Sequence, residues 1–214
     1  MDQVDLAKSL IDLLGENKIS TSKTDIDTHS IDKWLVGHPP DIVVFAESTE
    51  DVAAVMRFSY NNNVPVTTRG AGVGYVGGAV PIHGGIVLSV TRMNQIKEIN
   101  PEDGVAIVEP GVITGKLQES VKELGYFYPP DPASIKECSI GGNVATNAGG
   151  PRCLKYGVTR HYVLGIEVVL SDGSVVRLGG RCHKNKTGFD LIGMFVGSEG
   201  LLGIVTEITC RIIP

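Results

Sequence analysis

The feature that most constrains this chain is the glycine run at positions 70 to 78, inside the segment TTRGAGVGYVGGAV (67–80). Five of these nine residues are glycine, and the only charged side chain beside them is Arg69. Glycine tolerates positive φ angles and lets backbone approach a ligand, and successive N–H groups can bind an anion. The segment therefore predicts either a cradle for a phosphate or pyrophosphate, with Arg69 adding charge at its edge, or a glycine-rich turn between strands.

The run matches the pattern G-x-G-x-x-G from Gly72 to Gly77, which is the fingerprint of Rossmann-type dinucleotide sites. That fingerprint opens a helix whose first turn faces the pyrophosphate. Here one proline and three more glycines follow before residue 86, and they disfavour a helix. The sequence therefore argues against a Rossmann site.

A second cluster of small residues, SIGGNVATNAGG (139–150), adds independent information. Such a segment packs poorly as core, but it lets a flat ligand lie against the backbone, with hydroxyls and amides as hydrogen-bonding groups. The alternative is an uncommitted loop. A third segment, GSEGLLG (197–203), is weak evidence on its own.

The order of predicted elements favours an α+β fold. Apolar spacing predicts a first helix at 4–14, and the polar stretch at 16–41 predicts an irregular connector. Ser48 predicts an N-cap for a helix that ends near Tyr60. Further strands are expected at 42–45, 64–68, 86–90, 96–99, 105–109, 163–170, 174–178 and 203–213, with another helix at 114–124.

Composition excludes several classes of protein. Aromatic residues make up 6% of the chain and the formal net charge is −5, so a nucleic-acid partner is not expected. The four cysteines form no C-x-x-C pair and the five histidines no ligand pattern, so neither a metal site nor a catalytic side chain is predicted. No stretch predicts a transmembrane segment. We expect a cytoplasmic protein, and peripheral attachment to a membrane through a partner stays open.

Taken together, seven segments resemble the PCMH-type FAD-binding domain of the vanillyl-alcohol oxidase superfamily. Within it, the branch of the glycolate oxidase FAD subunit and the FAD-dependent D-lactate dehydrogenases is the most similar. The segments follow the order of that family and cover most of the chain from about Pro40 to Pro214, while the first forty residues match loosely. They are RGAGVGYVGGAV (69–80), VEPGV (108–112), YPPDPAS (128–134), CSIGGNVATNAGG (138–150), KYGVTRHYV (155–163), KNKTGFDL (184–191) and GSEGLLGIVTEI (197–208).

The resemblance implies an N-terminal helix and connector (1–40) and a PCMH-type domain (41–214) with two α+β subdomains, about 41–100 and 101–214. FAD would lie between the subdomains. The loop from Gly70 to Tyr75 would wrap its pyrophosphate, and Ile204 and Val205 would meet the adenine end through backbone groups. The cofactor-binding residues implied in this way are Arg69, Gly70, Ala71, Gly72, Val73, Gly74, Tyr75, Pro130, Asp131, Ser134, Cys138, Ser139, Gly141, Gly142, Asn143, Thr146, Asn147, Gly149, Gly150, Tyr156, Gly157, Glu199, Gly200, Ile204 and Val205.

The resemblance also addresses how FAD is held. Covalent members carry a histidine in the pyrophosphate loop, and residues 67–80 contain none. Some members use a cysteine near the position of Cys138, but the form CSIGG is also common in noncovalent relatives of the glycolate oxidase kind. The expected cofactor is noncovalent FAD.

The implied activity is oxidation of a small 2-hydroxyacid such as D-lactate or glycolate, with hydride passing to the flavin and electrons then passing to a partner protein. Family members continue beyond the equivalent of Pro214 into a substrate-binding cap domain. The resemblance thus implies a cap supplied by a longer chain or by a partner subunit. Two alternatives stay open: a flavin-binding or electron-transfer module without its own substrate site, and an enzyme like UDP-N-acetylenolpyruvoylglucosamine reductase, which would use NADPH.

Overall fold

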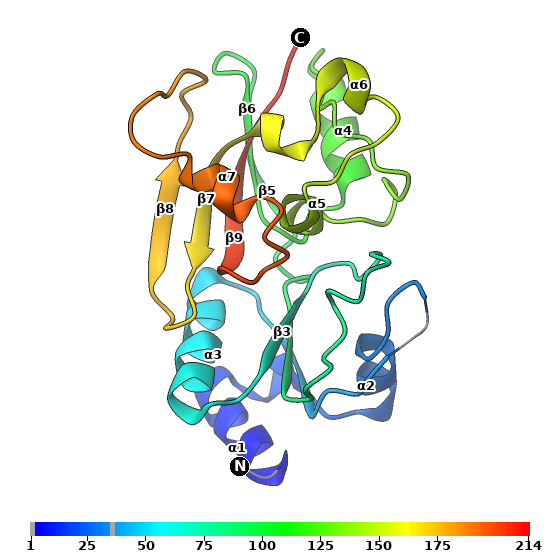
Figure 1. The fold of residues 1–214 in the computed structure, drawn as a ribbon, viewed down its shortest axis with the longest axis vertical. Helices are drawn as coiled ribbons and strands as arrows, with labels where there is room; N and C mark the ends of the chain where they lie inside the picture. The colour runs from blue at the N-terminus through cyan, green and yellow to red at the C-terminus, as the bar shows by residue number, and fades with distance from the viewer. Residues whose placement is uncertain (1–2, 35–36) are drawn as a thin grey trace.

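The computed structural model describes residues 3–34 and 37–214, which form two lobes, each built around one β-sheet (Figure 1). The first sheet has the strand order β1-β2-β4-β3. Strands β2 and β3 run parallel to β4, and β1 pairs antiparallel with β2. The bounds of these strands are β1 Ile19–Ser20, β2 Ile42–Phe45, β3 Val66–Arg69 and β4 Ile86–Ser89.

Helices cover the first sheet, and this explains why its central strands are apolar on both faces. Leu6 and Leu10 of α1 join the same buried cluster as Val52 and Val55 of α3. The longest helix, α3, has 14 residues, and none within the described ranges is long and apolar enough to cross a membrane. The helical segments of this lobe are α1 Gln3–Leu14, η1 Glu16–Lys18, α2 Lys23–His29 and α3 Thr49–Asn62.

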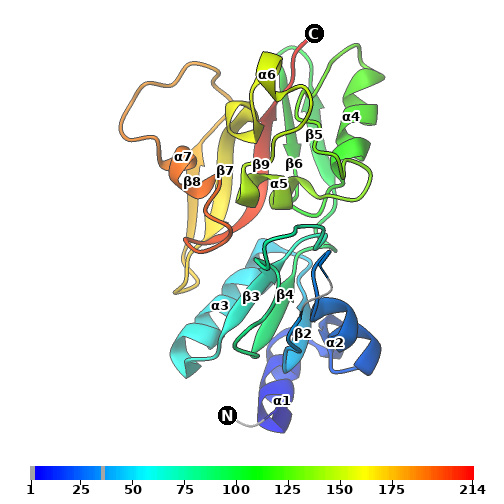
Figure 2. The same cartoon turned by 45° about the vertical axis from the view of Figure 1, so that its right-hand side comes forward.

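The second sheet is antiparallel and has the order β5-β6-β9-β7-β8, which Figure 2 shows as a fan above the first sheet. Its core contains the fully buried side chains of Leu117, Tyr128 and Ile208. The strands are β5 Ile96–Asn100, β6 Val105–Val108, β7 Val163–Val169, β8 Val175–Gly179 and β9 Ile204–Arg211. The helical segments are α4 Thr114–Lys122, α5 Ile140–Thr146, α6 Cys153–Tyr156, η2 Thr159–Tyr162 and α7 Leu191–Phe195.

The two lobes are joined by packing as well as by the chain. Val169 and Ile204, from the ends of β7 and β9, belong to the core cluster of the first lobe. The Thr49 hydroxyl at the start of α3 donates to the Glu167 carboxylate of β7 at 2.6 Å. These contacts place the carboxyl ends of the parallel strands under the second lobe.

The α+β fold and most of the predicted elements are confirmed, including the Ser48 cap, whose side chain accepts the Asp51 N–H. The prediction of an irregular connector at 16–41 is wrong, because this stretch contains β1 and α2. Helix α2 begins at a Ser22 cap, and β1 is too short to show alternation.

The boundary between the two sheets lies before β5 rather than near residue 100, because β5 pairs with β6. The short helix α5 lies inside the second glycine cluster, where glycines obscured its pattern.

The missed helix α2 predicts a pH dependence of stability. His29, its last residue, is buried with its ring edge-on to Phe45, and burial lowers the pKa of His29 below 6.5. Its neutral form is thus favoured in the folded state, so the unfolded state binds more protons as the pH falls below about 6.5. We expect the free energy of unfolding to decrease between about pH 7.5 and pH 5.5.

Urea unfolding at those two pH values measures this effect. The variant His29→Gln, which cannot titrate, should show a shallower decrease than the natural chain. An equally steep decrease in the variant would assign the pH dependence to other groups.

Candidate cofactor-binding cleft

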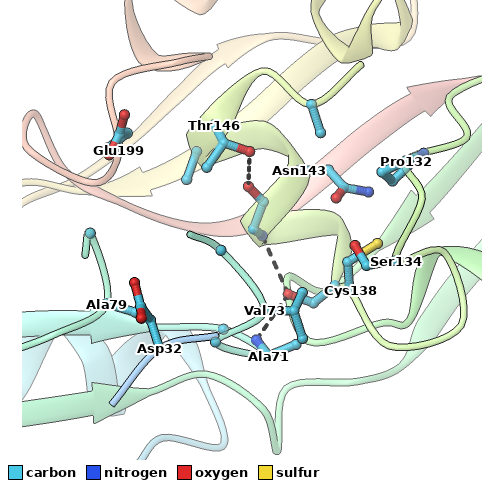
Figure 3. Close-up of a pocket in the computed structure, with 18 of the residues that line it drawn as sticks. Asp32, Ala71, Val73, Ala79, Pro132, Ser134, Cys138, Asn143, Thr146 and Glu199 are labelled. Atoms are coloured by element: carbon cyan, nitrogen blue, oxygen red, sulfur yellow. Dashed lines mark hydrogen bonds between the residues drawn. The ribbon is translucent and has the colours of Figure 1, made fainter. Parts of the chain in front are cut away.

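A cleft of about 830 Å³, including its open mouth, lies between the two lobes, at the carboxyl end of β3 (Figure 3). The glycine loop 70–79 forms one wall, and segments of the second lobe form the other. The lining residues are Asp32, Thr68, Gly70, Ala71, Gly72, Val73, Gly74, Val76, Gly78, Ala79, Pro132, Ser134, Cys138, Ser139, Gly142, Asn143, Ala145, Thr146, Ala148 and Glu199.

Two glycine segments, far apart in sequence, touch at the bottom of this cleft. A Cβ on Gly70 would lie 2.6 Å from the Ser139 hydroxyl oxygen, so a larger residue here would have to displace that hydroxyl. The same hydroxyl accepts the N–H groups of Ala71, at 3.4 Å, and Gly142, at 3.3 Å (Figure 3). Ser139 therefore has two roles: it caps α5, and it fixes the start of the glycine loop.

Four consecutive or near-consecutive loop residues, Gly72, Val73, Gly74 and Val76, line the cleft. Among the described residues, no hydrogen-bond partner is found for the N–H groups of residues 72–76. A Cβ added to Gly74 or Gly77 would have no heavy atom of another described segment within 4 Å. Of the two, Gly77 adopts a positive φ of 77°. A row of free N–H groups in such a loop is the chemistry expected of an anion-binding nest.

Arg69 lies behind the loop, not in the cleft. Its guanidinium donates to the carbonyls of Ile31 at 2.8 Å, Ala79 at 3.3 Å and Thr28 at 3.3 Å. Burial lowers the pKa of Arg69 from its ordinary value, and the nearby Asp32 carboxylate opposes that shift. The three carbonyl contacts hold the side chain away from the edge position that the sequence suggested.

The second cluster supplies the opposite wall through α5. The Asn143 amide donates to the Thr114 hydroxyl at 2.6 Å, and the Cys138 thiol lies 3.4 Å from the same oxygen. The Thr146 hydroxyl donates to the Gly142 carbonyl at 3.0 Å. These side chains line the cleft while bonded to the protein, so the wall is fixed before any ligand binds.

Glu199 connects the cleft to a second, smaller cavity of about 500 Å³. It adopts a positive φ of 52°, which is uncommon for a residue with a side chain, and its N–H donates to the Ala145 carbonyl at 2.8 Å. The second cavity shares Thr68, Gly70, Gly142, Ala145 and Glu199 with the first and extends to Ile204 and Val205. The two cavities are therefore neighbours.

Sixteen of the residues that the family resemblance implied line these two cavities. Twelve line the larger one: Gly70, Ala71, Gly72, Val73, Gly74, Ser134, Cys138, Ser139, Gly142, Asn143, Thr146 and Glu199. Gly141, Gly200, Ile204 and Val205 line the smaller one. The other nine line neither cavity: Arg69, Tyr75, Pro130, Asp131, Asn147, Gly149, Gly150, Tyr156 and Gly157.

Several of those nine have evident structural roles. Asp131 accepts the Arg152 N–H at 3.1 Å, and Gly150 packs directly on the Asp131 backbone. Asn147 ends α5 in the left-handed conformation and accepts the Arg160 N–H. The role of all twenty-five residues in cofactor binding stays a prediction.

Sequence reasoning missed some of the lining residues, of which Asp32 is the most informative. It lies in the stretch that looked like a connector, with no motif around it. The other residues missed in the larger cavity are Thr68, Val76, Gly78, Ala79, Pro132, Ala145 and Ala148. Most are small and apolar. They line the cleft because they are close in the chain to residues that do.

The residues present fit an elongated cofactor with a pyrophosphate. The free N–H groups of the loop suit the phosphates, and the hydroxyl and amide groups of the opposite wall suit the hydroxyl-bearing ribityl chain of a flavin. Both cavities offer open space, and they share five lining residues. A Cβ at Gly70 or at Gly141 would overlap neighbouring groups, so the glycines are needed to form these walls.

Comparisons with known proteins agree with this site. Glycolate oxidase subunit GlcD of Bacillus subtilis (strain 168) is 43% identical over 211 residues, covering 98% of this chain and 45% of that protein. D-lactate dehydrogenase of Anaerostipes hadrus is 47% identical over 175 residues, covering 82% of this chain and 37% of that protein. The chain thus spans less than half the length of these relatives.

The fold is also found in solved structures. That of p-cresol methylhydroxylase superposes with a TM-score of 0.82 at 26% identity, covering 99% of this chain and 43% of that one. Residues 40–179 match a family model described as an FAD binding domain, which is more than half of the chain. With its α+β lobes and a cleft that suits the cofactor, this chain belongs to the FAD binding domain family, in its PCMH-type form.

Proposed function

We propose that this chain is the FAD-binding part of a flavin-dependent dehydrogenase or oxidase that acts on a small 2-hydroxyacid, of the D-lactate or glycolate kind. The observation that carries the proposal is the similarity of nearly the whole chain to a glycolate oxidase subunit, at 43% identity. A D-lactate dehydrogenase is similar at a comparable level. Both names point to oxidation of a carbon that carries a hydroxyl.

The chain's own groups would bind and orient the cofactor. FAD, when bound, supplies the ring that accepts a hydride from the hydroxyl-bearing carbon. The free N–H groups of residues 72–76 would hold the pyrophosphate, and α5 would lie along the ribityl chain and the ring. We assign no catalytic side chain to these 214 residues.

Substrate-binding groups and the electron acceptor belong to the proposal as well. The Bacillus subtilis relative is named as a subunit, so it works within an assembly. We propose that a cap domain or partner subunit completes the substrate site here, and that electrons leave through a partner protein.

Anaerobic flavin reduction tests the proposed activity. The product of the complete reading frame, loaded with FAD, is mixed with D-lactate, glycolate or D-2-hydroxyglutarate, with L-lactate as the stereochemical control. We expect one D-hydroxyacid or glycolate to bleach the flavin absorbance. Bleaching by NADPH alone would favour the reductase-like alternative, and bleaching only by a reduced partner protein would favour an electron-transfer module.

Acid precipitation tests how the cofactor is held. Since residues 67–80 contain no histidine and the Cys138 thiol is buried against Thr114, we expect FAD to be released into the supernatant. Absorbance of the supernatant and of the redissolved pellet measures the partition. Flavin that stays with the pellet would contradict noncovalent binding, and Cys138→Ser would then identify or exclude that thiol as the attachment point.

A further inference from the structure

We propose that residues 31–34 act as a splint that holds the glycine loop 70–79 in its anion-binding conformation, with Asp32 as the positioning residue. The inference rests on the proposed contact between this loop and the FAD pyrophosphate, and it is independent of which substrate is oxidised. The segment 31–34 lies outside the glycine motif. It also lies outside the family match, which begins at residue 40.

The splint contacts the loop at its start, middle and end. Arg69, just before the loop, donates to the Ile31 carbonyl at 2.8 Å. The Lys33 N–H donates to the Gly74 carbonyl at 3.2 Å. The Gly77 N–H donates to the Asp32 carboxylate at 2.9 Å. Three contacts along nine residues, 69 to 77, restrain the path of a loop whose glycines would otherwise leave it many conformations.

Both carboxylate oxygens of Asp32 are used by backbone. One accepts the Gly77 N–H, and the other accepts the Trp34 N–H at 2.8 Å, so the carboxylate joins the splint to the loop. Asp32 is only 7% exposed although it lines the cleft. A carboxylate beside an anion site is repulsive, and its presence is understandable when its oxygens serve the protein, not the ligand.

Pre-organisation matters here because the cleft offers no cationic side chain. Among the described residues that line it, the charged ones are Asp32 and Glu199, both acidic. A pyrophosphate must therefore be held by N–H dipoles, with Arg69 contributing only from behind the loop. Dipoles bind an anion well only when they are already aimed at it, so loss of the splint should weaken binding directly.

The splint also reaches across to the second lobe. The Lys33 ammonium pairs with the Glu137 carboxylate at 2.7 Å, and the Trp34 ring lies edge-on to Tyr75 with centroids 6.2 Å apart. Glu137 immediately precedes Cys138, which lines the cleft. The segment thus touches both walls of the site.

The test combines flavin affinity with hydrogen–deuterium exchange of the 214-residue chain. Asp32→Ala frees two backbone N–H groups, and we expect FAD to bind about tenfold more weakly. Exchange of the peptide 70–80 should increase in the absence of FAD, while the second sheet stays protected. Asp32→Asn keeps only one acceptor oxygen, so it should show a smaller effect of the same kind and covers the case in which the alanine variant does not fold.

Asp41→Ala is the matched control. Asp41 also accepts a glycine N–H, that of Gly85 at 2.8 Å, but at the opposite end of the first sheet. It should change exchange near residue 85 and leave FAD affinity within about twofold.

The outcomes separate the splint from the pyrophosphate contact on which it depends. FAD that binds without protecting residues 70–80 would overturn the contact. FAD that protects them while both Asp32 variants keep natural exchange and affinity would overturn the splint. Equal weakening of FAD binding by Asp41→Ala would show a general loss of stability and would also overturn it.

Discussion

Replacing Leu10 with alanine is expected to lower the free energy of unfolding by about 2–5 kcal/mol. Leu10 of α1 is fully buried in the core cluster of the first lobe, together with Ile42, Ile86 and Leu88 of the sheet. Truncation removes apolar contacts and leaves a cavity that a helix packed on a sheet cannot close. Urea unfolding of the natural chain and the variant measures the change.

Leu13 provides the control on the same helix. Its side chain is 45% exposed, so Leu13→Ala should cost well under half as much. Equal effects of the two substitutions would show that burial of Leu10 is not the reason for its cost, and no effect of either would show that α1 does not stabilise the first lobe. The expected contrast would mean that the first forty residues are part of the folding unit.

Gly150→Ala is expected to cost about 1–3 kcal/mol or more in the free energy of unfolding. A Cβ at this position would overlap the carbonyl carbon and oxygen of Asp131, and backbone cannot move aside as a flexible side chain can. The substitution should separate the segments around Asp131 and Gly150, which adjoin the lining residues Pro132 and Ala148. Urea unfolding without FAD measures the loss in the free energy of unfolding. The same measurement with saturating FAD shows how much of that loss the cofactor restores.

The neighbouring Gly149→Ala is the matched control. Its Cβ would meet Val158 and Cys153 at 3.5 Å or more, which is ordinary van der Waals contact. We expect a change within about 0.5 kcal/mol. If Gly149→Ala proved as costly as Gly150→Ala, the close approach to Asp131 would not be the reason that glycine is needed.

Much of the site could be predicted from local sequence because its chemistry is local. A row of free N–H groups needs a loop outside helices and strands, and the closely spaced glycines from Gly70 to Gly78 indicate such a loop directly. The Ser48 cap and the buried strand β2 were predictable for the same reason. Short elements were not: α2, β1 and α5 have too few residues for their spacing to show.

The sequence by itself determined which glycine-rich segments line the cleft, because backbone freedom and small side chains are properties of each segment alone. Only the tertiary structure decided how those segments are held. Ser139 meets Ala71 across 68 residues, and Asp32 meets Gly77 across 45. It also turned Arg69 behind the loop, toward three carbonyls. A hydrogen bond over such a separation leaves no local pattern, since one polar residue in a connector resembles any other.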